Sequence, residues 1–142
     1  MNTTERREGE SRPMSFAFWD RKIGPFLDEG GVLNVAALSA DELRVCEEFG
    51  DILVLPTAGD RDALYPAFQF GPRGELLPGL REIVASLRPS ATDDWDIALW
   101  LATVRKKYHG RCAVDLMWAG RAQEVVLSAK ADSALWTAGV SQ

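Results

Sequence analysis

The residues best suited to chemistry gather in one short segment, Arg105 to Arg111, which reads RKKYHGR. It combines four Lys/Arg side chains with a tyrosine and the single histidine of the chain. Arginine and tyrosine are favoured anchors in protein interfaces, and a basic loop also suits phosphate groups or an acidic cleft. The alternative is a solvated, charged loop. The candidate partner-binding residues of this segment are Arg105, Lys106, Lys107, Tyr108, His109 and Arg111.

The same segment offers little for catalysis. His109 and Cys112 lie three residues apart, but the sequence supplies neither a nucleophile paired with a base nor a group to orient that base. One histidine and two cysteines do not make a four-ligand zinc pattern, and the sequence has neither a P-loop nor a dinucleotide-binding glycine motif. We therefore expect a protein that is not an enzyme, with no catalytic residue, metal ligand or cofactor.

Helices are expected before this segment. The run WDIALWLATV is apolar on nearly every face, and Thr92 is its predicted N-cap. Such a helix lies in the centre of a core or is covered by another chain. Trp95 is predicted for the core, and Trp100 stays open between the two settings. A further helix is predicted from about Pro78 to Leu87, because the apolar residues after Pro78 have helical spacing.

After the segment, a short helix is expected over Ala113 to Ala119 and a second over Arg121 to Lys130, followed by a tail of small residues, DSALWTAGVSQ. Two tryptophans in this part are further candidates for partner binding, because tryptophan is over-represented in interfaces. They are Trp118, late in the short helix, and Trp136, in the tail. For each, burial within its own chain is the alternative.

The N-terminal half predicts a helix followed by a small β-hairpin. Ser39 and Glu42 form a capping box, and the helix that starts there is expected to place Leu43, Cys46 and Phe49 on one face. The runs ILVLP and ALYP flank the turn-rich TAGDRD, as in a hairpin. A helix and a hairpin in this order match a helix-turn-helix with a wing.

The charge of this half argues against DNA. Residues 1–70 hold seven Lys/Arg against thirteen Asp/Glu, whereas residues 71–142 hold nine against eight. The predicted helix carries four carboxylates with Arg44 as its one basic residue, and such a face repels phosphate. We interpret residues 16–64 as a degenerate, structural version of a helix-turn-helix lobe.

Length and composition limit the class of protein. A chain of 142 residues with 46% hydrophobic content can bury one compact core. No run approaches the roughly 20 apolar residues that span a bilayer, and the start, MNTTERREGESRP, is too polar for a secretory signal. We expect a cytoplasmic protein with a disordered tail over residues 1–15. The expected fold class is mainly α, a small helical domain with one short β-hairpin.

The stretch Tyr65 to Gly79, YPAFQFGPRGELLPG, predicts an extended arm, a turn and the start of a helix. This order is followed by Trp95 in DDWDIALWL and then by GRCAVDLMWAG. Together these motifs resemble the Xre/MbcA/ParS toxin-binding domain family of bacterial antitoxins. The match runs from about Leu64 to Ala131, which is roughly half of the chain. Where the family usually has a proline-containing loop, this chain keeps Gly110-Arg111 and has Ala113 in place of a common proline.

The resemblance implies that residues 65–142 form a helical toxin-binding domain and that the protein is the antitoxin of a type II toxin–antitoxin system. The implied partner is a RES-domain or ADP-ribosyltransferase-like toxin that consumes NAD, and the antitoxin would occlude its active site sterically. Two alternatives stay open. One is a DNA-binding autoregulator that uses a homodimer to reach two half-sites, and the other is an orphan scaffold that has kept the fold and lost its toxin.

Overall fold

The computed structural model describes residues 16–57 and 63–137. Within these ranges the chain is mainly helical, with one two-stranded antiparallel sheet, so the predicted fold class is confirmed. The predicted tail over residues 1–15 and most of the hairpin turn TAGDRD lie outside the described residues. None of the described helices combines the length and the apolarity that crossing a bilayer requires.

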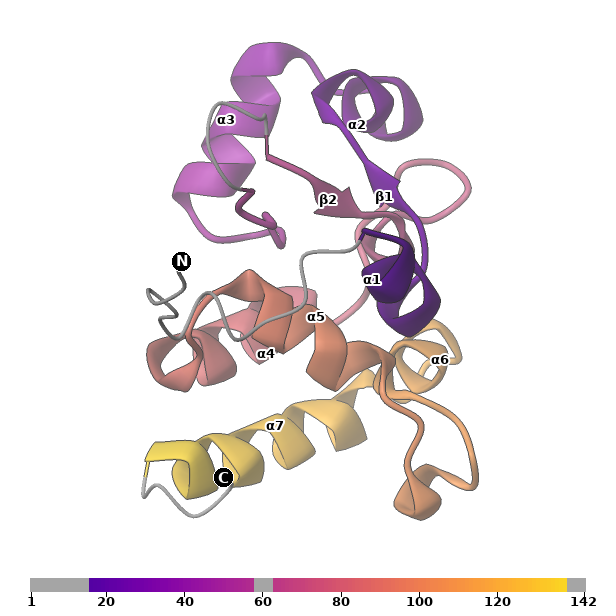
Figure 1. Ribbon diagram of the computed structural model, residues 1–142, viewed down its shortest axis with the longest axis vertical. Helices are drawn as coiled ribbons and strands as arrows, with labels where there is room; N and C mark the ends of the chain where they lie inside the picture. The colour runs from indigo at the N-terminus through magenta and orange to yellow at the C-terminus, as the bar shows by residue number, and fades with distance from the viewer. Residues whose placement is uncertain (1–15, 58–62, 138–142) are drawn as a thin grey trace, which may run out of the picture.

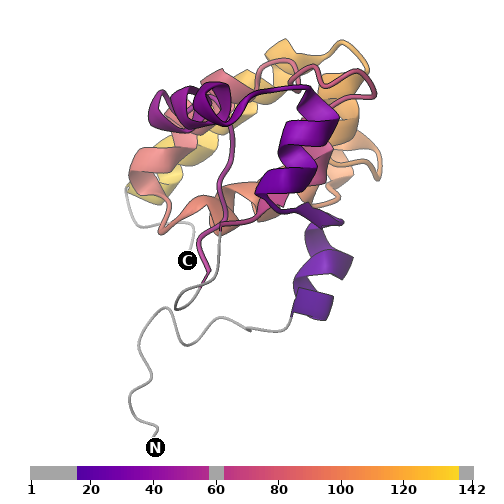
Figure 2. The ribbon, with the colours of Figure 1, turned by 90° about the horizontal axis from the view of Figure 1, so that it is seen from above.

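The elements fall into two groups along the long axis of the molecule (Figure 1). The N-terminal elements are α1 (Phe16–Ile23), β1 (Phe26–Leu27), α2 (Glu29–Ala36), α3 (Ala40–Glu48) and β2 (Tyr65–Pro66). The C-terminal helices are α4 (Leu80–Leu87), α5 (Asp94–Ala102), α6 (Ala113–Trp118) and α7 (Ala122–Thr137). Seen from above, α2 and α3 lie in front of the C-terminal helices, and α1 lies to one side (Figure 2).

Helices α2 and α3 form a helix-turn-helix. The Oδ1 atom of Asp28 caps α2 by accepting a hydrogen bond from the Gly31 N–H at 2.7 Å. Ala37 ends α2 in the left-handed region, with φ of 57°, and the chain turns directly into α3. The predicted capping box of α3 is confirmed, because Ser39 and Glu42 exchange both hydrogen bonds.

One prediction for α3 was wrong. Leu43 is buried and Cys46 half-buried, but Phe49 is 72% exposed and does not share their apolar face. Phe49 is the C-cap of α3, where the helix ends, so helical spacing no longer fixes its direction. The exposed ring is a surface feature of this lobe.

The predicted hairpin forms around one backbone pair, because Leu55 and Leu64 exchange two hydrogen bonds of 2.7 and 3.1 Å. The sequence did not predict that a third segment would join it. Strand β1 pairs antiparallel with β2, placing Phe26 opposite Pro66 and Leu27 opposite Tyr65. The start of the YPAFQF motif is therefore a strand that pairs with the segment following α1.

The rest of YPAFQF departs from an extended arm, because Ala67–Gln69 make one turn of 3-10 helix. This turn directs Gln69 into the interior, where it is fully buried. Its Oε1 atom accepts from the Leu53 N–H at 2.7 Å, and its Nε2 atom donates to the Leu53 carbonyl at 3.0 Å. A side chain thus takes the place of a neighbouring strand along Leu53.

Two helix starts were predicted slightly wrong. Helix α4 begins at Leu80 rather than Pro78, because Gly79 adopts a left-handed conformation with φ of 84° and serves as the N-cap. Helix α5 is capped by Asp93 rather than Thr92, since the Asp93 carboxylate accepts from the Trp95 N–H at 3.0 Å. Asp96 accepts from the Thr92 N–H at 2.9 Å, which holds Thr92 just outside the helix.

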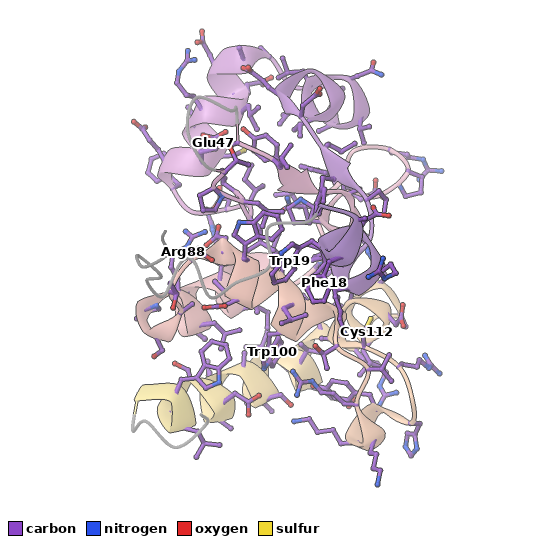
Figure 3. The ribbon with its side chains drawn as sticks, viewed as in Figure 1. Phe18, Trp19, Glu47, Arg88, Trp100 and Cys112 are labelled. Carbon is purple, nitrogen blue, oxygen red and sulfur yellow. The ribbon has the colours of Figure 1, made fainter. Side chains whose placement is uncertain are left out.

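Two hydrophobic clusters hold the fold together. The smaller one lies under the helix-turn-helix and contains Val32, Leu43, Ile52, Tyr65 and Phe70. The larger one joins α4, α5, α6 and α7, and it also includes Trp19 and Ile23 of α1. In Figure 3, Phe18 and Trp19 lie side by side above α5. Because α1 and Leu53 belong to the larger cluster, residues 16–64 do not pack as a unit separate from the C-terminal helices.

A buried carboxylate, Asp94, joins the two groups. Asp94 is buried at the start of α5 and accepts from the Arg88 guanidinium at 2.7 and 3.2 Å. It also accepts from the Val54 N–H at 2.9 Å. The carboxylate therefore connects α5, the end of α4 and the chain that leads out of α3.

Candidate partner-binding site

The basic segment is a closed hairpin, which we call the basic hairpin (Arg105–Arg111). The Arg105 N–H donates to the Arg111 carbonyl at 3.0 Å, and the Gly110 N–H donates to the Arg105 carbonyl at 3.1 Å. Between them lies a turn of 3-10 helix, Lys106–Tyr108, which ends at His109 with φ of 59°. The predicted loop thus has a defined backbone that fixes where its side chains point.

The basic hairpin presents four basic or titratable side chains to solvent and buries Tyr108. Tyr108 is 6% exposed, and its hydroxyl has no hydrogen-bond partner among the described residues. Lys107 contacts Ser128 of α7 through its Nζ at 3.2 Å and lies 5.4 Å from the centre of the Tyr108 ring. Tyr108 therefore anchors the hairpin from inside rather than offering its hydroxyl to a partner. The exposed side chains are Lys106, Lys107, His109 and Arg111.

Arg105 is half-buried and contacts α5. Its guanidinium carbon lies 5.0 Å from the centre of the Trp100 ring, and its Nη2 donates to the Trp100 carbonyl at 3.2 Å. Its Nε is buried without a hydrogen-bond partner in the described part of the chain. Arginine over the face of a tryptophan is a favourable cation–π contact, so Arg105 holds the base of the hairpin against α5.

The sequence left open whether Trp100 lies in the core or against a partner. In the structure its side chain is buried within the protein. It is 5% exposed, and its Nε1 donates to Asp132 of α7 at 2.7 Å. In Figure 3 its label falls between α5 and α7. Trp95 lies in the core as predicted, and its Nε1 donates to the Pro56 carbonyl at 2.8 Å.

The C-terminal helix is longer than predicted. Helix α7 runs to Thr137, whereas the sequence reading ended it at Lys130 and placed Trp136 on a tail. Residues 131–135 contain neither glycine nor proline, so nothing stops the helix there. Trp136 is consequently on the same helix face as Ala129, half-buried and packed against the larger cluster.

A groove opens between α5 and the C-terminal half of α7. We call it the α5–α7 groove, and its volume is about 590 Å³. It is lined by Trp100 and Trp136 together with charged side chains, which are Asp96, Arg105 and Asp132. Leu135 forms one edge and is 48% exposed, so the groove continues onto the outer face of α7.

The outer face of α7 is apolar and uncovered. Leu127 is 59% exposed, and Ala131, Ala134 and Leu135 are exposed along the same side. We call these four residues the α7 stripe. This stripe was not predicted from the sequence, because the helix was expected to end at Lys130. The spacing i, i+4, i+7, i+8 was the signal that would have revealed it.

Trp118 is not among the residues that line the α5–α7 groove, and a hydrogen bond holds its side chain in place. Its ring is 37% exposed, and its Nε1 donates to the Phe68 carbonyl at 3.2 Å. Trp118 thus joins the end of α6 to the YPAFQF motif.

The two thiols are unsuited to nucleophilic chemistry. Burial raises the pKa of Cys112, which stands at the N-cap of α6. Burial and the nearby Asp51 raise the pKa of Cys46. Since the thiolate is the reactive form, both groups are less nucleophilic at neutral pH than a free cysteine.

Comparison with known proteins shows the fold. No protein-family model matches the chain. No curated protein sequence matches it either. The structure is similar to the NMR structure of Rv2175c, with a TM-score of 0.64 and 21% sequence identity. The similarity covers 77% of this chain and 81% of that one. At this identity the similarity shows a shared fold alone.

Proposed function

We propose that this chain is the antitoxin of a toxin–antitoxin pair, and that it binds its toxin through the basic hairpin, the α5–α7 groove and the α7 stripe. The observation that carries the proposal is the α7 stripe. Leu127 and Leu135 are exposed on a helix whose opposite face packs in the core through Val125, Val126 and Ala129. An apolar helix face of this kind is the usual surface for docking another protein.

The neighbouring features suit the same role. The basic hairpin contacts α7 through Lys107 and Ser128, so its charges border the stripe. The 16 residues of α7 extend about 24 Å, which matches one side of a standard interface of about 1,600 Å² in total. A partner with an apolar patch and an acidic rim would complement this surface.

The toxin class comes from the resemblance of the YPAFQF, DDWDIALWL and GRCAVDLMWAG motifs to antitoxin toxin-binding domains. On this basis the partner is a RES-domain or ADP-ribosyltransferase-like enzyme that consumes NAD in the cytoplasm. Inhibition is steric, because the antitoxin covers the entrance of the toxin's active site. The antitoxin itself performs no reaction.

A second candidate is a DNA-binding regulator, which the helix-turn-helix geometry of α2 and α3 favours. The chemistry of α3 opposes it, because Asp41, Glu42 and Glu48 are exposed and Arg44 is ion-paired with Asp41. A phosphate-binding protein loses affinity steeply as salt rises. Absence of binding to the upstream DNA at low salt would eliminate this candidate.

The test of the antitoxin proposal begins with recovery of the tagged full chain from its host in mild salt. The bound protein is identified by mass spectrometry and assayed for NAD⁺ consumption, with and without added chain. We expect one NAD⁺-consuming protein in near-equal amount, whose activity disappears when the chain is added in equimolar quantity. A recovered partner that lacks this activity, or that keeps it in the complex, would refute the proposal.

The site is tested by placing a charge on the stripe. Leu127→Glu should weaken toxin binding by about tenfold or more, because the interface would then bury an unpaired carboxylate. The matched control is Val35→Glu, the same kind of change at an exposed position of α2. Both variants should keep the native circular dichroism spectrum. Equal binding by the two variants would move the site away from α7.

A further inference from the structure

The exposed face of α3, the second helix of the helix-turn-helix, carries both acidic and apolar side chains. Asp41, Val45 and Glu48 follow the spacing i, i+4, i+7, which places them on one side of α3, and the exposed Phe49 follows directly at the C-cap. Val45 is 49% exposed, so with Phe49 it makes an uncovered apolar pair. The carboxylates at the two ends of this face make it acidic.

This face is a poor match for nucleic acid and a good match for a basic protein surface. Helix α3 carries Asp41, Glu42, Glu47 and Glu48 against Arg44 alone. These carboxylates would repel the phosphates of a nucleic acid. An occupant of α3 must therefore bring positive charge beside an exposed apolar side chain.

The chain itself carries such a surface at the opposite end of its long axis (Figure 1). Val104 is 64% exposed immediately before the basic hairpin. Lys106, Lys107 and Arg111 are exposed in the hairpin, which contains no acidic residue. This apolar side chain beside positive charges is the complement of Val45 beside the α3 carboxylates, while Phe49 also borders Arg81 and Arg88 of the α4 side.

We propose that copies of this chain associate head to tail, with α3 of one copy on the basic hairpin of another. The two surfaces lie at opposite ends of the folded chain, so they meet between copies and not within one. Val104 would pack against Val45 and Phe49, while hairpin lysines face the α3 carboxylates. Charge complementarity of this kind sets orientation and excludes the like-charged pairings of α3 with α3 or hairpin with hairpin.

Self-association has a regulatory consequence for the hairpin. A basic hairpin covered by α3 of another copy is closed to any other acidic partner. Binding of such a partner and head-to-tail association would therefore compete. The self-association stands independently of the antitoxin proposal, since it uses the free protein alone.

Sedimentation velocity on the full chain, from low micromolar to several hundred micromolar, tests the association. The average mass should rise with concentration at low salt and fall back at high salt. Glu48→Lys and Lys106→Glu should each raise the dissociation constant by about tenfold, because each places like charges together. The matched controls Glu82→Lys and Lys130→Glu make the same charge changes at exposed positions of α4 and α7 that are not among the proposed contact residues, and should associate as the parent does.

Mixing gives the decisive result. Glu48→Lys and Lys106→Glu restore opposite charges across the contact when they meet, so an equimolar mixture should associate more strongly than either variant alone. A parent chain that stays monomeric at every concentration would overturn the proposal, as would a mixture no stronger than its components. Neither result would bear on the antitoxin proposal. That proposal is tested by the NAD⁺-consuming activity of the recovered partner and by the toxin binding of Leu127→Glu.

Discussion

Replacement of Gln69 by methionine should destabilise the fold more than any comparable polar-to-apolar change on the surface. Gln69 is fully buried and bonds both the N–H and the carbonyl of Leu53, at 2.7 and 3.0 Å. Methionine has nearly the same volume and shape, so Gln69→Met leaves no large cavity. What it removes is the pairing of two buried backbone groups.

The magnitude follows from those two groups. A buried donor or acceptor that loses its partner costs about 1–3 kcal/mol, and Leu53 would lose both partners. The methionine side chain recovers a little by being apolar. We expect Gln69→Met to lower the free energy of unfolding by about 2–4 kcal/mol, a large share of the stability of a domain of this size.

The assay is equilibrium unfolding in urea, followed by far-UV circular dichroism. Gln123→Met is the matched control, because Gln123 is exposed on α7 and the same change there should stay within about 0.5 kcal/mol. A loss below about 1 kcal/mol for Gln69→Met would show that the Leu53 backbone is paired in another way. The role assigned to Gln69 would then be wrong.

Three further predictions follow from the fold and its thiols. Asp94→Ala should cost about 2–4 kcal/mol in thermal unfolding, because it leaves a partly buried guanidinium and a backbone N–H without their acceptor. Gly74→Ala should cost about 1–3 kcal/mol, since φ is +82° and the added Cβ would lie 2.7 Å from the Ala36 Cα; an unchanged melting temperature would contradict that packing. Cys46 and Cys112 should alkylate more slowly at pH 8 than a free cysteine peptide, because a raised pKa leaves less thiolate at that pH; equal rates would refute the burial.

Local sequence signals predicted the structure correctly where a few neighbouring residues determine the backbone conformation. The capping box of Ser39 and Glu42 fixed the start of α3, and the runs on either side of TAGDRD fixed the Leu55–Leu64 pair. Caps act over three or four residues, so they can be read without the fold. The helix ends were less well predicted, because Thr92 and Asp93 are both good caps and tertiary contacts choose between them.

The candidate site was found in outline from composition and missed in its apolar part. The concentration of Lys and Arg in residues 105–111 marked the hairpin as a surface feature. The inward position of Tyr108 was not visible, because an aromatic residue in a basic run suits a surface or a core equally well. The α7 stripe was missed because the helix was predicted to end before Leu135.

By itself, the sequence determined that α3 and the C-terminal segments are helical, where the turn-forming residues lie and how unevenly charge is divided between the halves. These are properties of neighbouring residues, and they need no knowledge of the fold. The tertiary structure alone decided which apolar side chains stay uncovered. Trp100 and Leu127 are both apolar residues on helices, but Trp100 faces Asp132 and Leu127 faces solvent. The direction a helix face takes depends on the elements packed around it, and that is settled only when the chain has folded.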